Sequence, residues 1–121
     1  MKNSHKCTAL AISCIDYRFV GKVRQYLIDQ GLKDNYDLIT VPGASLKLAD
    51  VADSISTSMR LHDPDEVYIF DHEDCGAYGV NNSKSEHIKN LNHAKERILK
   101  NNPEKLVSTY FTDFNFVEEI N

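Results

Sequence analysis

The feature that most constrains this chain is a regular alternation between short apolar segments and longer segments with helical periodicity. The apolar segments are rich in β-branched, aliphatic and aromatic residues, and three segments with helical spacing separate them. This rhythm is typical of repeated strand–helix–strand units, whose strands lie parallel in one sheet. We therefore predict four strands, at Thr8–Cys14, Tyr36–Val41, Glu66–Phe70 and Leu106–Thr112.

Each of the three intervening segments has the spacing of an amphipathic helix. In the first, residues 18–32, apolar residues recur at helical spacing, and Gly31 stands where a helix C-cap is expected. The second, Leu46–Leu61, is closely followed by Pro64, which cannot continue a helix. The third, Ser85–Lys100, combines an apolar stripe with many charged residues, which indicates one buried and one solvated face.

Together these elements predict an α/β fold with a mostly parallel four-stranded sheet in the order 2-1-3-4 and helices on both faces, a three-layer sandwich. The chain has 121 residues, enough to bury one core but too few for two, so we predict a single domain over residues 1–121. The C-terminal segment FNFVEEIN keeps several apolar residues, and we expect it to dock on the core or on a second subunit.

Composition and charge argue against several classes of protein. The formal net charge is -4, and the Lys and Arg residues are scattered along the chain, so we do not expect a nucleic-acid partner. No segment approaches the ~18 consecutive apolar residues of a membrane span. The N-terminal apolar run is short and lacks a small-residue cleavage site, so we interpret it as a strand and expect a cytoplasmic protein.

Three cysteines in a chain without a signal peptide favour metal binding or thiol chemistry over a disulfide framework. Cys7 has no chemical neighbour in the sequence and is predicted to be a structural thiol. A redox role for Cys14 and Cys75 is the weaker alternative, because the chain has no C-x-x-C pair. Four further histidines are predicted to be surface residues without metal-binding partners: His5, His62, His87 and His93.

Reactive side chains follow the first predicted strand in the segment CIDYR. Cys14, Asp16 and Arg18 occupy alternate positions there, and alternate side chains of an extended backbone share one side. A thiolate, a carboxylate and a guanidinium group then converge on one small volume. Taken alone, a capping Asp and a surface Arg explain the segment equally well.

A second reactive segment, DHEDCGA, follows the third predicted strand. Its His72 and Cys75 are three residues apart, so both can face one metal in a tight turn, and an imidazole with a thiolate suits zinc. In the predicted sheet the first and third strands are neighbours, and their carboxyl ends flank the crevice where ligands bind. Cys14 then becomes a third ligand, which leaves one tetrahedral position open, as in catalytic zinc sites.

The two segments together resemble the β-class carbonic anhydrase family. CIDYR is similar to the Cys-x-Asp-x-Arg motif of that family and HEDCGA to its His-x-x-Cys-Gly-Ala motif, in the same order, and VPGA and VSTYFTDF extend the resemblance. The resemblance implies zinc ligands at Cys14, His72 and Cys75, and reversible hydration of carbon dioxide to bicarbonate by a zinc-bound hydroxide. It also implies that Asp16 accepts a hydrogen bond from that hydroxide, while Arg18 holds Asp16 ionised.

The resemblance further implies a homodimer or a dimer of dimers. Residues 40–44 keep the Gly of the family's corresponding segment but lack its Arg and Asn, which leaves the substrate open. One alternative is the same zinc site acting on carbonyl sulfide or carbon disulfide. Another is an inactive zinc-stabilised binding module, in which Asp16 closes a four-ligand site.

The ligand charges predict the pH dependence of such an enzyme. Two thiolates offset the charge of zinc, so water bound there is less acidified than under three neutral histidines. We therefore expect hydration activity to rise toward alkaline pH. A pH–rate profile that peaks below neutrality would contradict this expectation.

Overall fold

The computed structural model describes residues 5–120 and confirms the predicted α/β fold. Residues 1–4 and 121 belong to the predicted domain but lie outside the described residues, so the single-domain assignment stays a prediction. In chain order the elements are β1 (Ala9–Ser13), α1 (Tyr17–Asp29), β2 (Tyr36–Thr40), the 3₁₀ helix η1 (Ala44–Val51), α2 (Ala52–His62), β3 (Glu66–His72), the 3₁₀ helix η2 (Gly76–Tyr78), α3 (Lys84–Asn101), β4 (Leu106–Thr112) and β5 (Val117–Glu119).

The sheet has the predicted strand order, with one further strand at its edge. Its order is β2-β1-β3-β4-β5, and all neighbours pair in parallel except β4 and β5, which are antiparallel. β5 comes from the C-terminal segment, which therefore docks on the core of its own chain. The Asp113 carboxylate accepts hydrogen bonds from the backbone N–H groups of Asn115 and Phe116 at 2.7 and 2.6 Å, and so fixes the turn between the two strands.

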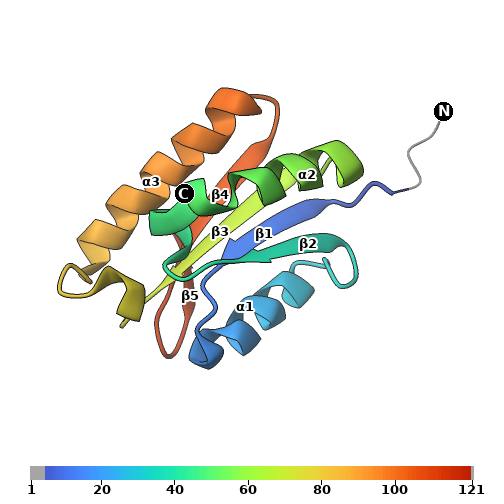
Figure 1. Cartoon of the computed structure of the whole chain (residues 1–121). Coiled ribbons are helices and arrows are strands. Elements are labelled where there is room, and N and C mark those ends of the chain that lie inside the picture. The colour runs from blue at the N-terminus through green and yellow to red at the C-terminus, as the bar shows by residue number, and fades with distance from the viewer. Residues whose placement is uncertain (1–4, 121) are drawn as a thin grey trace.

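Both faces of the sheet are covered by helices, α1 on one face and α2 and α3 on the other (Figure 1). In β1, Ala9 and Ala11 pack in the cluster on the α1 side, whereas Leu10 and Ile12 pack in the cluster on the α2 and α3 side. Because alternate side chains meet different helical layers, every position of this strand must be apolar or small. This explains the unbroken apolar run of the sequence.

The segment predicted as one helix over Leu46–Leu61 is divided into η1 and α2. Lys47 has non-helical φ and ψ of -112° and 25°. Ser45, two residues earlier, is held near the end of β3, because its backbone N–H and its hydroxyl both donate hydrogen bonds to the Asp71 carboxylate. The amphipathic spacing survives the interruption, since Leu48 and Ile55 enter the same core cluster.

Local hydrogen bonds set the end of α1 and the start of α3. Gly31 has a φ of +80°, and its N–H donates to the Ile28 carbonyl at 2.9 Å, which confirms the predicted end of α1. α3 starts slightly before the predicted Ser85, because the Ser83 hydroxyl accepts a hydrogen bond from the Glu86 N–H at 3.2 Å. Within residues 5–120 no helix is both long and apolar enough to cross a membrane.

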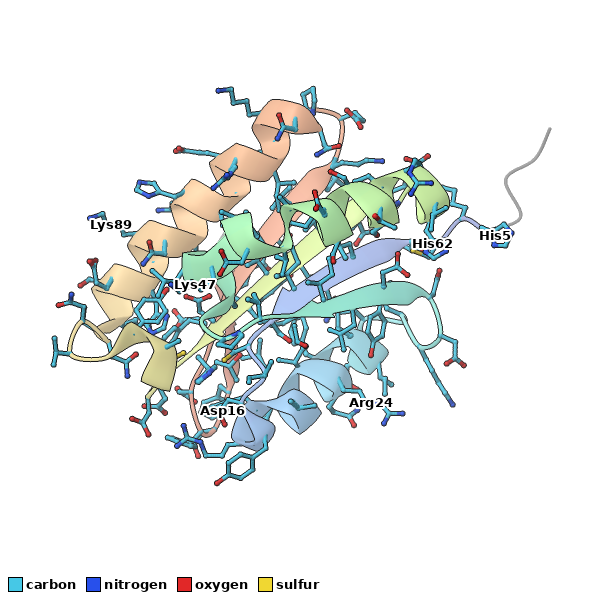
Figure 2. All side chains as sticks on the ribbon, in the orientation of Figure 1. His5, Asp16, Arg24, Lys47, His62 and Lys89 are labelled. Atoms are coloured by element: carbon cyan, nitrogen blue, oxygen red, sulfur yellow. The ribbon has the colours of Figure 1, made fainter. Side chains whose placement is uncertain are left out.

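The two ends of the parallel strands carry different side chains. The carboxyl ends of β1 and β3 lie side by side at one end of the sheet, where Asp16 lies. His62 lies at the opposite end, near the N-terminus (Figure 2). Ligands of open parallel sheets bind outside the carboxyl ends of the strands. A site is therefore expected at the carboxyl ends of β1 and β3.

Candidate metal site

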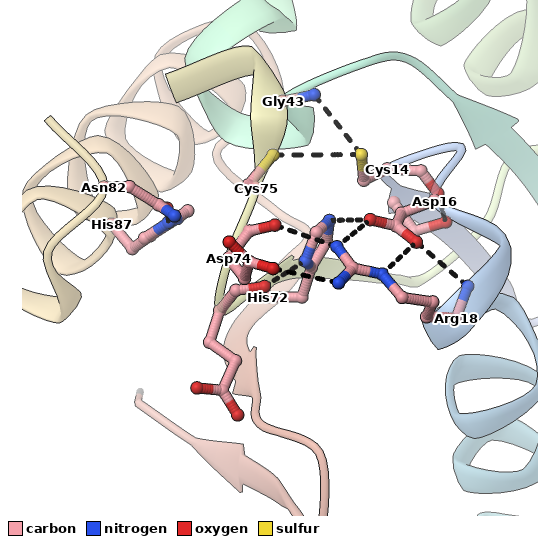
Figure 3. A network of polar contacts seen from close by, with 11 residues as sticks. Cys14, Asp16, Arg18, Gly43, His72, Asp74, Cys75, Asn82 and His87 are labelled. Carbon is pink, nitrogen blue, oxygen red and sulfur yellow. Dashed lines mark hydrogen bonds and ion pairs between the residues drawn. The ribbon is translucent and has the colours of Figure 1, made fainter. Parts of the chain in front are cut away.

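The structure brings Cys14, His72 and Cys75 together, as the sequence predicts (Figure 3). Cys14 directly follows β1, His72 is the last residue of β3, and Cys75 follows after a tight turn. One donor atom from each of these side chains lies within 4.8 Å of the other two. The two Sγ atoms are 4.0 Å apart, close to the ~3.8 Å expected for two sulfurs bound to one tetrahedral zinc. The group can therefore hold a metal ion.

The orientation of His72 supports this reading. Its Nδ1 lies 2.6 Å from the Glu73 carbonyl oxygen, to which it donates, and its ring stacks on Phe19 with the ring centroids 4.2 Å apart. Its Nε2 is buried and has no hydrogen-bond partner among the residues that the structure describes. A buried nitrogen left unpaired is costly. Because this nitrogen faces the two thiols, the donor set fits a metal ion such as zinc.

The contact between the two thiols shifts their pKa values in opposite directions. A hydrogen bond from Cys75 lowers the pKa of Cys14, and the Gly43 N–H, 3.5 Å from the Cys14 sulfur, acts in the same direction. The pKa of Cys75 is raised because its thiol donates to Cys14 and because it is buried. Without a metal, one proton is thus held between the two sulfurs. A bound cation has to displace that proton, so metal affinity should increase with pH.

Gly43 is required at its position by two independent constraints. Its φ of +88° lies in the left-handed region, and a Cβ there would lie 3.2 Å from the Ala77 Cβ. This close approach is what brings the Gly43 N–H to the Cys14 sulfur. The glycine in VPGA, one of the residues on which the family resemblance rests, therefore has a direct role in shaping the site.

Asp16 and Arg18 form a two-pronged ion pair beside the three donors. Arg18 Nε and Nη2 donate to the two Asp16 carboxylate oxygens at 3.0 and 2.7 Å. The hydrogen bonds from Arg18 lower the pKa of Asp16 to about 2, so this side chain is ionised at neutral pH. Asp16 also caps α1 by accepting from the Arg18 N–H at 2.9 Å. One of the carboxylate oxygens, Oδ2, lies 3.8 Å from His72 Nε2.

Asp74 is a site residue that the sequence analysis missed. Arg18 Nη1 donates to its carboxylate and Nη2 to its carbonyl oxygen, both at 2.9 Å. Arg18 thereby ties the start of α1 to the turn between His72 and Cys75. The usable signal in the sequence was the position of Asp74 inside the H-x-x-C turn. The structure gives it a φ of 54°, which Asp tolerates better than most residues.

A buried polar network lies behind the metal ligands and is centred on Asp71. Its carboxylate accepts hydrogen bonds from the Ser45 hydroxyl at 2.8 Å, the Tyr78 hydroxyl at 2.7 Å and His87 Nδ1 at 2.6 Å. His87 Nε2 in turn lies 2.8 Å from the Asn82 side-chain oxygen. Because Asp71 immediately precedes His72, this network anchors η1, η2 and α3 around the end of β3.

The prediction that His87 is a surface residue is wrong, since its side chain is fully buried. A sequence signal for this was present. His87 falls on the buried stripe of α3 that also contains Leu91, Ala94 and Ile98, at the three- and four-residue spacing of one helix face. His93, on the opposite face, is exposed as predicted.

A cavity of about 370 Å³ opens next to Cys14 and Cys75. Ile15, Pro42 and Ala77 give it an apolar wall, and Asp16 and Arg18 supply charged groups. A larger cavity of about 450 Å³ lies between α2 and α3, but no His, Cys or acidic residue lines it. The first cavity is bordered by two members of the Cys14, His72 and Cys75 group, so we take it as the candidate site.

A second group of side chains with metal-binding donor atoms lies at the opposite end of the sheet, beside the amino ends of β1 and β2. One donor atom each from Cys7, Asp37 and His62 lies within 4.8 Å of the other two. The prediction that Cys7 has no chemical neighbour and that His62 lacks metal-binding partners is therefore wrong. These residues are far apart in the chain and form no spacing motif. Pairing of β1 with β2 brings Cys7 near Asp37, and the Cys7 N–H donates to the His62 carbonyl at the end of α2.

Comparison with known proteins agrees with the fold. A family model described as "Putative carbonic anhydrase" matches residues 4–121. A tetrameric β-carbonic anhydrase from Sordaria macrospora matches with a TM-score of 0.59 and 13% identity, over 98% of this chain and 82% of that chain. A β-carbonic anhydrase from Aspergillus fumigatus matches with a TM-score of 0.54 and 15% identity, over 97% and 76% of the two chains. At such low identities, the structural matches establish similarity of fold.

Two uncharacterised bacterial proteins are closer in sequence. They come from Rickettsia conorii and Rickettsia bellii and are 29% and 28% identical to this chain over 138 aligned residues. Each alignment covers 98% of this chain, and they cover 74% and 84% of the two relatives. The similarity therefore extends over most of all three proteins.

The Asp71 network generates a stability prediction. In His87→Ala the buried Asp71 side chain loses the hydrogen bond from His87 Nδ1, and losing one hydrogen bond to a buried group of this kind costs about 2 kcal/mol. Urea unfolding at neutral pH measures the free energy of unfolding. The matched control His93→Ala removes an exposed histidine from the same helix and should change it by less than about 0.5 kcal/mol. Equal stability of the two variants would contradict the anchoring role of Asp71.

Proposed function

Because the chain belongs to the family described as "Putative carbonic anhydrase", we propose that it catalyses the reversible hydration of carbon dioxide to bicarbonate at a zinc ion. Cys14, His72 and Cys75 are the proposed ligands. The observation that carries the proposal is the buried, unpartnered Nε2 of His72 facing two thiols.

The donor set supports zinc over other common ions. Two sulfurs and one imidazole nitrogen are soft to borderline ligands, which favours zinc over magnesium or calcium. Three protein ligands are the number found in catalytic zinc sites, which keep a fourth position for water or substrate. Zinc held in this way lowers the pKa of water and so supplies a nucleophile under mild conditions.

Asp16 is the proposed catalytic partner of that nucleophile. With a pKa of about 2 its carboxylate remains an acceptor over the whole working range, so it can orient an O–H group but cannot act as an acid. Arg18 fixes its position through two hydrogen bonds. A carboxylate oxygen that accepts one hydrogen bond can accept another, so Asp16 can receive the O–H of the nucleophile while Arg18 holds it in place.

The cavity supports a small apolar substrate. Ile15, Pro42 and Ala77 form an apolar wall beside the charged pair of Asp16 and Arg18, and such a wall suits a small linear molecule such as carbon dioxide. Carbonyl sulfide and carbon disulfide share this shape. Assaying the three substrates on one preparation distinguishes them, and we expect carbon dioxide to be preferred.

We also propose that a second copy of the chain covers the opening of this site. Tyr17 and Ile15, at the rim, are 87% and 57% exposed, and Phe114, whose ring lies beside the Arg18 guanidinium, is 45% exposed. Such a concentration of exposed apolar side chains is typical of an interface. The enzyme from Sordaria macrospora is described as tetrameric. Analytical ultracentrifugation should show a dimer or tetramer, and a monomer at micromolar concentrations would contradict the proposal.

The catalytic proposal predicts a separation of metal binding from turnover. Asp16→Asn keeps a side-chain oxygen for capping α1 but loses the charge that orients the nucleophile. We expect this variant to retain zinc, measured by elemental analysis, while kcat/KM for carbon dioxide hydration falls about 100-fold in stopped-flow assays.

The matched control is Asp50→Asn, which removes an exposed carboxylate away from the cavity and should leave both zinc content and kcat/KM unchanged. A zinc-loaded wild-type protein without measurable hydration activity would contradict the proposed function. Equal rates for the wild type and Asp16→Asn would contradict the role of Asp16.

A further inference from the structure

Three side chains with metal-binding donors meet at the amino ends of β1 and β2, at the end of the sheet opposite the site described above. Cys7 lies in the segment before β1, Asp37 in β2, and His62 is the last residue of α2. Figure 2 shows His62 and His5 together at this end of the molecule and Asp16 at the other end. The two groups of donors share no residue, so this one requires a separate explanation.

The backbone holds these residues in place independently of any ligand. The Cys7 N–H donates to the His62 carbonyl at 3.0 Å, which fixes the start of the described chain against the end of α2. Parallel pairing of β1 with β2 sets Leu10 opposite Asp37. The Thr8 N–H donates to the Asn35 side chain at 2.9 Å, which reinforces that register. A site preorganised in this way needs little rearrangement to bind an ion.

The donors are close enough to share a cation. His62 Nδ1 lies 2.9 and 2.7 Å from the two Asp37 carboxylate oxygens, and the Cys7 sulfur lies within 4.8 Å of the donor atoms of both residues. The side chains of His62 and Asp37 are 33% and 27% exposed, so an ion from solution can reach them. The Ser58 hydroxyl donates to Asp37 at 2.7 Å and steadies the carboxylate.

A simple ion pair between Asp37 and His62 accounts for only part of this arrangement. It leaves the Cys7 thiol beside a carboxylate, with a hydrogen bond to the Ala9 carbonyl at 3.3 Å. The neighbouring cation, Lys6, does not neutralise Asp37, because it pairs instead with Asp63 and Asp65. A divalent cation would satisfy all three donors at once.

We infer that Cys7, Asp37 and His62 form a second metal site, selective for zinc or a similar borderline divalent cation. One sulfur, one nitrogen and one oxygen donor match the ligands that zinc accepts in proteins. The bound ion joins the segment before β1 to β2 and to the end of α2, so its role is structural. The exposed ring of His5, 6.3 Å from the ring of His62 between centroids, is a candidate for a fourth ligand.

Metal content tests this inference. After zinc loading and exhaustive dialysis, elemental analysis should find two zinc ions per wild-type chain, and one in Cys7→Ser and in His62→Ala. The matched control His93→Ala removes an exposed histidine far from both groups and should keep two. One zinc per wild-type chain, unchanged by Cys7→Ser and lost in Cys14→Ser, would overturn the second site and leave the proposed function intact.

Cobalt substitution gives a second readout that does not depend on activity. In a titration of the metal-free protein, thiolate-to-cobalt charge-transfer absorption should increase up to two equivalents in the wild type and stop at one in Cys7→Ser. The second equivalent should also raise the melting temperature of the wild type but not of Cys7→Ser, because an ion that binds only the folded chain stabilises it. An identical titration for both proteins would contradict the inference.

Discussion

Parallel pairing of β1 with β3 is the constraint on which the candidate site depends. The two strands lie side by side only because the chain crosses over after β2, and their carboxyl ends then present Cys14 and His72 at one edge. The ligands come from segments separated by almost half of the chain, so neither segment can hold the metal alone. The apolar alternation that builds the sheet is therefore also what assembles the site.

Two polar networks stabilise this edge in different ways. The Asp71 network is buried, and each of its hydrogen bonds acts in a medium of low dielectric, so it fixes the backbone on which His72 stands. The network around Arg18 is partly exposed and joins α1 to the turn that carries Cys75. The first is best understood as an anchor for the fold, and the second as a device that keeps a carboxylate ionised and in position.

Much of this was predictable because it depends on local patterns. Strand order, the three helical regions and the Cys14, His72 and Cys75 group all follow from apolar periodicity and from two short motifs. The division of the second helix was not predictable, because it depends on the distant bond between Ser45 and Asp71. The group of Cys7 with Asp37 and His62 was not predicted for the same reason, since strand pairing and a backbone bond between Cys7 and His62 bring its distant members together.

The central claim is that the two sulfurs and the free imidazole nitrogen bind one zinc ion. Anomalous diffraction at the zinc edge from crystals of the zinc-loaded protein tests it most directly. The account predicts a peak about 2.3 Å from Sγ of Cys14 and of Cys75 and about 2.0 Å from Nε2 of His72. Well-ordered side chains with no anomalous peak among them, in crystals that contain zinc elsewhere, would contradict it.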